Sequence, residues 1–167
     1  WNIAPNQDAT FSPRILTDRG LMLGAEYRYL AERHQGEIDV EYLPDDRVFN
    51  DDRSAFRVLH RANPVPRLFT DLIYQYVSDD EYIDDLENNL DLLSPNFLER
   101  RFDITYHGDR WTALARLQGF QTLNPTVDEG DDYNRVPQLL FDGHWPEQLY
   151  GLDVSLRAEA VRFDSND

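Results

Sequence analysis

The chain has 167 residues, and its 32 acidic side chains outnumber its 16 basic ones, giving a formal net charge of −16. This charge excludes nucleic acid as a natural ligand, because the phosphate backbone would be repelled. The chain has no cysteine, so a disulfide framework and a thiolate metal site are also excluded.

Hydrophobic residues make up 41% of the chain and the mean hydropathy is −0.65. That is polar for a sequence in which so many stretches alternate apolar and polar residues. A wall of strands with one face toward lipid and the other toward water has this composition, because it needs no closed apolar interior. No apolar run approaches the roughly 18 residues of a helical span. The chain begins at Trp1 without a signal segment, so we expect a mature product or a piece of a longer protein.

Period-two alternation predicts about nine strands. It is clearest between Leu21 and Leu30, where Leu23 and Tyr27 fall on one face while Glu26 and Arg28 fall on the other. In chain order, the predicted strands cover residues 1–16, 21–30, 37–43, 54–60, 68–77, 98–107, 111–121, 136–145 and 150–163.

The connections alternate between short and long. Pro44 is expected to end the third strand, strands 54–60 and 68–77 are expected to pair, and His107-Gly108-Asp109 predicts a tight hairpin. Residues 78–96 and 122–135 form long irregular stretches, the first with partial helical spacing around Tyr82 and Leu86. Short turns on one side and long loops on the other are typical of outer-membrane barrels, and so are aromatic residues near strand ends.

The predicted fold is therefore all-β, an antiparallel up-and-down transmembrane β-barrel segment in a single unit covering residues 1–167. The strand count is odd and both chain ends fall in or beside strand-like sequence, whereas bacterial barrels normally have an even number and join first strand to last. We therefore expect an incomplete part of a larger barrel.

Residues that carry chemistry form no recognisable site. The four histidines, His34, His60, His107 and His144, lie far apart beside turns and are expected to be solvated. No metalloprotease, nucleophile-elbow or phosphate-loop motif is present, and the acidic stretches lack the ligand spacing of a calcium loop. The sequence thus predicts a protein that is not an enzyme and that has no metal or cofactor.

Several stretches in chain order resemble the LptD family, the LPS-assembly (organic solvent tolerance) proteins of Gram-negative outer membranes. They look like the start of that family's barrel, its third and fifth strands with their loops, and its eighth strand. The matching residues are 1–10 (WNIAPNQDAT) with Ser12-Pro13-Arg14 and Arg19-Gly20; Gly36-Glu37 with 41–46 (EYLPDD); 76–79 (YVSD) with Tyr82, Asp84 and Asp85; and Pro137-Gln138-Leu139.

The resemblance implies a translocon of the cell outer membrane that inserts lipopolysaccharide (LPS) into the outer leaflet. In that family a very large barrel is plugged by the lipoprotein LptE and receives LPS from the periplasmic bridge protein LptA through an N-terminal jellyroll domain. The lipid portion leaves sideways between the first and last strands, beside outer-membrane lipids. This chain lacks the jellyroll and the family's cysteines, so it is expected to be a segment of the full protein.

The resemblance places a lateral gate at the first strand. Its prolines match prolines of the family, and proline cannot donate to a strand ladder, so such an edge pairs weakly. The gate residues are Asn2, Pro5, Asn6, Asp8 and Pro13. Residues expected to face the lumen are Glu26, Arg28, Glu37, Asp39, Glu41, Arg101, Asp103, Arg116, Gln118, Asp153, Arg157 and Glu159. Residues expected to face lipid are Leu23, Tyr27, Ile38, Val40, Phe102, Ile104, Leu152, Val154 and Leu156.

Other interpretations of the alternation remain open. The chain could be a fragment of a different outer-membrane barrel, or a soluble β-sandwich binding module with its two apolar faces packed together. An acidic glycosidase is a third alternative, although no pair among the 32 acids is singled out by its spacing.

Overall fold

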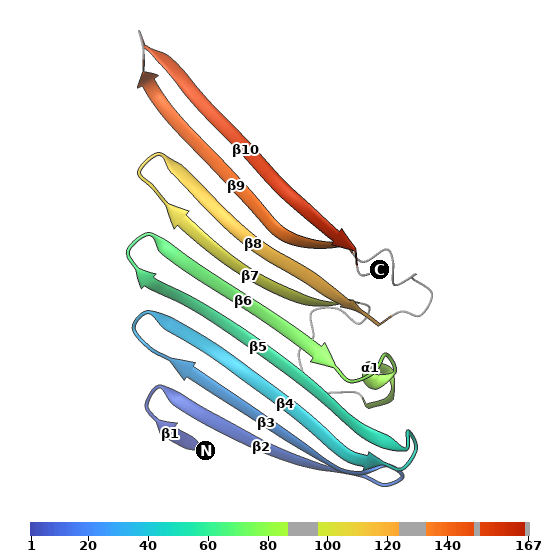
Figure 1. Ribbon diagram of the computed structural model, residues 1–167. Helices are drawn as coiled ribbons and strands as arrows, with labels where there is room; N and C mark the ends of the chain where they lie inside the picture. The colour runs from blue at the N-terminus through green and yellow to red at the C-terminus, as the bar shows by residue number, and fades with distance from the viewer. Residues whose placement is uncertain (87–96, 124–132, 149–150, 166–167) are drawn as a thin grey trace.

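The computed structural model describes residues 1–86, 97–123, 133–148 and 151–165. These residues form one sheet of ten strands in the order β1 to β10. Each strand is antiparallel to the next, and Figure 1 shows them side by side in chain order with β1 and β10 at opposite edges. The sheet is not closed. The predicted all-β, up-and-down fold is confirmed, and it is consistent with a partial barrel.

The elements have the following bounds. The strands are β1 Asn2–Ala4, β2 Gln7–Leu16, β3 Gly20–Leu30, β4 His34–Asp46, β5 Asp51–Val65, β6 Leu68–Val77, β7 Phe97–His107, β8 Trp111–Thr122, β9 Tyr133–Gln148 and β10 Leu152–Ser165. A short helix, α1, covers Tyr82–Leu86. The sequence allowed for a helix here, whereas residues 87–96 and the acidic stretch 128–132 lie outside the described residues.

The strand count is ten rather than nine, because the first predicted strand is divided. A turn at Pro5 and Asn6 separates β1 from β2. The odd count therefore gives no argument for an incomplete barrel. The open order of the sheet, with an unpaired edge at each end, supports that conclusion instead.

The third predicted strand does not stop at Pro44, since β4 continues to Asp46. The register between β4 and β5 is irregular between Leu43 and Asp46, so the missing N–H of Pro44 removes no regular ladder bond. The pairing of β5 with β6 and the hairpin between β7 and β8 are both confirmed.

The two ends of the sheet differ in their connections (Figure 1). At one end, which we call the short-turn end, the chain turns at residues 5–6, 31–33, 66–67 and 108–110. At the opposite end, the long-loop end, it turns at residues 17–19 and 47–50, and longer segments of sequence separate β6 from β7 and β8 from β9. The predicted alternation is thus strongest in the second half of the chain.

The two faces of the sheet differ in chemistry. Residues directly paired in neighbouring antiparallel strands lie on the same face. The polar face includes the paired row Asp8, Arg28, Glu37, Leu59, Ile73, Arg101 and Gln118. The apolar face includes the adjacent row Ala9, Tyr27, Ile38, Val58, Tyr74, Arg100 and Gly119.

Buried apolar residues gather in one cluster at the long-loop end, where α1 packs on the polar face. The cluster contains Met22, Leu43, Ala55, Val77, Tyr82, Leu86, Leu98 and Leu123. Elsewhere the large side chains of the apolar face are exposed; Val40, for example, is 40% exposed. A continuous exposed apolar surface of this kind is suited to contact with lipid or with another apolar surface.

Candidate functional site

The first edge of the sheet is weakly paired. β1 has three residues, and its register with β2 is limited to Asn2 with Asp8 and Ala4 with Gln7. Ala9 and Trp1 exchange two further backbone bonds. The Ala9 N donates to the Trp1 O at 2.9 Å, and the Trp1 N donates to the Ala9 O at 2.6 Å. Beyond Ala9, β2 has no strand partner on this side among the described residues.

Pro13 lies on this free edge. The N–H and C=O of Ala9 point away from β3, toward Trp1, and residues two or four positions along a regular strand point the same way. The register between β2 and β3 is unbroken from Gln7 to Leu16, so the backbone of Pro13 also points to the free edge. Its missing donor therefore weakens the edge and leaves the β2–β3 ladder intact.

The other predicted gate residues lie near the same edge, at the short-turn end. Pro5 and Asn6 form the turn between β1 and β2 rather than part of a strand, and Asn6 Nδ2 donates to the Leu30 O at 2.6 Å. Asp8 accepts from Arg28 Nε at 2.9 Å. These residues border a hollow of about 540 Å³ beside the first strand.

Charged side chains of neighbouring strands pair across the polar face. Arg57 on β5 binds both Glu37 and Asp39 on β4, with Nε 3.0 Å from Asp39 Oδ2. Arg116 on β8 binds Asp103 on β7 through two bonds of 2.8 and 2.7 Å. Because these charges of Arg57 and Arg116 have opposite partners, the face can remain charged without closing on itself.

The register places the residues predicted for the lumen and those predicted for lipid on different faces of the sheet. Residues predicted for the lumen share the polar face where the register defines it: Glu26, Arg28, Glu37, Asp39, Glu41, Arg101, Asp103, Arg116, Gln118, Arg157 and Glu159. Asp153 lies at an irregularity between β9 and β10, and its carboxylate accepts from the Glu147 N at 3.0 Å. The residues predicted to face lipid share the opposite face.

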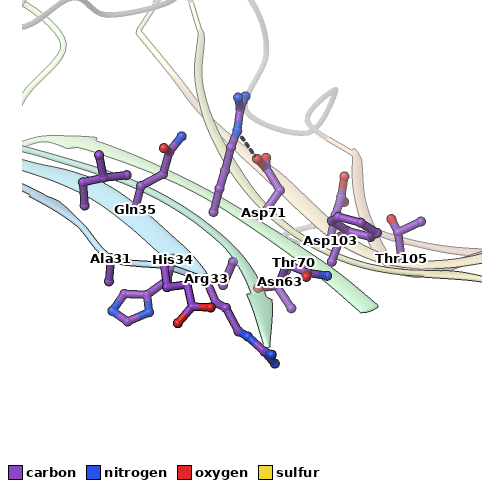
Figure 2. A pocket seen from close by; sticks show the side chains of 14 residues that line it. Ala31, Arg33, His34, Gln35, Asn63, Thr70, Asp71, Asp103 and Thr105 are labelled. Atoms are coloured by element: carbon purple, nitrogen blue, oxygen red, sulfur yellow. Dashed lines mark hydrogen bonds and ion pairs between the residues drawn. The ribbon is translucent and has the colours of Figure 1, made fainter. Parts of the chain in front are cut away.

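A hollow of about 470 Å³ opens on the sheet at its short-turn end. Figure 2 shows Gln35 and Asp71 projecting to one side of the strands, while His34 and Arg33 project to the other. The dashed line is the 2.7 Å bond from Arg61 to Asp71. A paired guanidinium and carboxylate with neutral amides suits a polar headgroup, and it offers no group activated for catalysis.

Helix α1 and the residues before it are anchored to the polar face by Arg53 of β5. The Arg53 side chain is 0% exposed and lies 2.5 Å from Asp79, 2.8 Å from Asp85 and 3.4 Å from Asp46. Its guanidinium also stacks 4.5 Å from the ring centroid of Phe49. One buried arginine thus joins two turns and a helix.

Three further contacts extend this anchor to other strands. Arg14 on β2 donates to the Leu86 O at 2.5 Å, and the Tyr82 hydroxyl donates to Glu41 on β4 at 3.1 Å. Arg19, which lies in the turn between β2 and β3, binds Asp85 at 3.0 Å. Hydrogen bonding from Arg53 holds the pKa of Asp85 below its usual range.

The sequence missed this anchor because the acidic residues 79–85 looked like a solvated loop. The signal that could have found it is Arg53 itself, which shares a strand face with Ala55 and Arg57 in a run otherwise expected to meet water. His60 was predicted to be solvated. It is half-buried and lies 2.6 Å from the Tyr29 hydroxyl.

Aromatic rings cover glycines at the short-turn end. A Cβ on Gly36 would overlap Tyr29, one on Gly108 would overlap Trp111, and one on Gly143 would overlap Trp145. Trp111, Phe141 and Trp145 stack in series, with centroids 5.7 and 6.3 Å apart. The glycines therefore give the rings a place to lie against the strands.

Metal-binding and helical-span features were also sought. Within the described part of the chain, no group of three or more histidine, cysteine, aspartate or glutamate residues is arranged to hold a metal ion. None of the described helices has the length and apolar character needed to cross a membrane.

Known proteins are similar to this chain along nearly its whole length. A family model described as LPS transport system D, LptD, matches residues 51–167. The LPS-assembly protein LptD of Nitrosococcus oceani is 46% identical over 165 residues, which cover 98% of this chain and 22% of that protein. The corresponding proteins of Acinetobacter baylyi and Aromatoleum aromaticum are 42% and 39% identical, over 99% and 100% of this chain and 21% of each protein.

Proposed function

The chain belongs to the LptD family of LPS transport proteins, and from this premise we propose that it forms the first part of the barrel wall of an outer-membrane translocon that inserts LPS into the outer leaflet. It spans about a fifth of the length of the relatives it matches, between 21 and 22% for the three described above. In this proposal residues 1–167 are one wall segment, with a jellyroll and further strands elsewhere in the full protein.

The two faces and the two ends of the sheet support this assignment. The apolar face would meet membrane lipid and the polar face a hydrated lumen, as in outer-membrane barrels. The short-turn end would face the periplasm and the long-loop end the cell exterior. No catalytic step is part of the proposal.

The lateral gate would lie at the free edge formed by β1 and β2. The observation that carries this assignment is the direction of the Pro13 backbone, which removes a donor from the edge without weakening β2 against β3. The short β1 and the turn at Pro5 and Asn6 leave little pairing to break when the edge opens. LPS would pass here toward the outer-membrane lipids.

The partners follow from the family rather than from any contact of this chain. LPS is the transported substrate, the lipoprotein LptE would plug the lumen, and LptA would deliver LPS through the jellyroll outside this segment. The polar face, with its balanced ion pairs, is the surface of this chain available to the plug and to the sugar and phosphate groups of LPS.

Photocrosslinking in cells tests the gate. A photoreactive residue placed in the full-length protein at Ser12 or Arg14, on either side of Pro13, should capture LPS, whereas one at Leu139, on the apolar face of β9, should capture little. Capture at Leu139 without capture beside Pro13 would contradict the gate assignment. Recovery of the intact protein in a soluble fraction without detergent would contradict the barrel itself.

A further inference from the structure

Arg100 is an exception on the apolar face. Nine arginine side chains lie on strands β2 to β9, and eight of them project to the polar face by register or by contact: Arg14, Arg28, Arg53, Arg57, Arg61, Arg101, Arg116 and Arg135. Arg100 pairs with Tyr74 and stands on the other face, among side chains suited to lipid. A charge on a lipid-facing surface is costly unless it reaches a polar partner.

The Arg100 side chain extends toward the long-loop end. Its Nη2 donates to Gln121 Oε1 at 2.9 Å, and Gln121 in turn bonds both the N and the O of Val77, the last residue of β6. The guanidinium therefore sits level with the end of β6. This is the behaviour of a long cationic side chain that carries its charge toward the membrane surface.

Two phenol groups surround the guanidinium. Its Cζ lies 5.3 Å from the ring centroid of Tyr74 and 5.8 Å from that of Tyr76, and these tyrosines are 36% and 37% exposed. Within the described residues, neither phenol makes a hydrogen bond. Of the five N–H groups of Arg100, one bonds the Gln75 O at 3.3 Å and one bonds Gln121, so its Nη1 has no acceptor in the described part of the chain and can donate to a ligand.

We propose that Arg100, Tyr74 and Tyr76 bind the phosphate group of an anionic lipid from the membrane side of the wall, at the level of the outer leaflet. The guanidinium supplies charge and a planar pair of donors, which is the geometry that phosphate oxygens accept. The phenols add two neutral donors. This site rests on the proposed function for its orientation, and it is separate from the gate, which lies four strands away at β1 and β2.

The phosphate could belong to the lipid A part of LPS or to a phospholipid. The full-length protein with its plug lipoprotein is placed in phosphatidylcholine nanodiscs that contain a small share of lipid A, of lipid A without phosphates, or of phosphatidylglycerol. Native mass spectrometry then counts the lipids retained. Retention of lipid A alone identifies the outer-leaflet source, and retention of both phosphate lipids supports a site for any anionic lipid.

Arg100→Gln should lower retention of the phosphate lipid about tenfold, the effect of losing one charge-assisted bond. Arg100→Lys should lower it less, and Arg110→Gln, a matched change in a turn at the short-turn end, should leave it unchanged. Equal retention in wild type and Arg100→Gln would overturn the proposal. So would equal retention of lipid A without its phosphates.

Arg100 also bridges the end of β6 to β7, so its loss could disturb assembly. The double change Tyr74→Phe and Tyr76→Phe keeps both rings against Arg100 and removes only the phenol donors. It should lower retention while leaving the temperature of unfolding unchanged. Unchanged retention in this variant would overturn the assigned role of the two phenols as donors to the phosphate. LPS export in cells is measured separately, because export should continue in Arg100→Gln if only this lipid site is lost.

Discussion

At the scale of single residues, arginine organises the polar face. All 16 basic residues of the chain are arginine and none is lysine. A guanidinium can bind several carboxylates at once, and it remains charged when buried. Arg53 uses this capacity most fully, because its three carboxylate partners are Asp46 at the end of β4, Asp79 two residues after β6, and Asp85 in helix α1.

Replacing Arg53 by methionine should destabilise the folded protein by about 3 kcal/mol, since the fully buried Asp46 would lose a partner. The temperature at which the folded form converts to the unfolded form on a detergent gel measures this loss. Arg157→Met is the matched control. Its pair with Asp142 is exposed, 87% and 60%, and should contribute less than about 1 kcal/mol. Equal shifts in the two variants would contradict the assigned role of Arg53.

At the scale of elements, the first edge and helix α1 have opposite characters. β1 and the outer side of β2 make few bonds, whereas α1 is held by side chains of β2, β4 and β5. Arg14 connects the first edge with helix α1, because it lies next to Pro13 on β2 and donates to the Leu86 O of α1. The long-loop end of β2 is thus fixed while its outer edge is left open.

Pro13→Ala should restore one N–H to the free edge and strengthen its pairing with the strand that completes the barrel. In the full-length protein we expect slower LPS export and greater sensitivity to large antibiotics. Labelled LPS reaching the cell surface provides the measurement. Pro66→Ala, in a turn at the short-turn end, is the control and should leave export unchanged. Unchanged export in Pro13→Ala would argue against the edge as a gate.

The anchor of α1 should resist mild acid. The pKa of Asp85 is lowered by hydrogen bonding from Arg53, so its contribution is complete above the unfolded value of about 4 and disappears as the pH falls through the lower folded value. Amide exchange at residues 82–86, corrected for intrinsic rates, should show constant protection from pH 8 to pH 5. Asp85→Asn should reduce protection at neutral pH. A loss of protection near pH 6 in the wild type would contradict this assignment.

Sequence patterns predicted the strands better than the contacts between distant segments. Alternation places Glu26 and Tyr27 on opposite faces whatever the rest of the chain does, because it depends only on strand geometry. The turn at Pro5 and Asn6 was missed because residues 1–16 keep their alternation on both sides of it. The bond between Arg14 and Leu86 joins residues 72 apart in the chain, and no local pattern encodes such a meeting.

At the scale of the whole molecule, the sheet is a two-faced wall, and substitutions should have opposite effects on its two faces. Ile104→Arg places a charge on the apolar face and should cost about 2 to 4 kcal/mol in a membrane. Thr105→Arg, one position along on the polar face, should be tolerated. The two variants are compared by the amount of folded protein recovered in the outer membrane. Equal recovery would contradict the assignment of the faces.

The strand order has a consequence for how this wall is built. In the described part of the chain every strand pairs only with its neighbours in sequence, so the sheet can grow one hairpin at a time with little loop to close at each step. The anchor of α1 does not obey that rule, because Arg14, Glu41 and Arg53 must already be in register before the segment after β6 can dock on them. Docking of α1 therefore requires β2, β4 and β5 to be in register, and a register error in one of them would leave α1 without that strand's contacts.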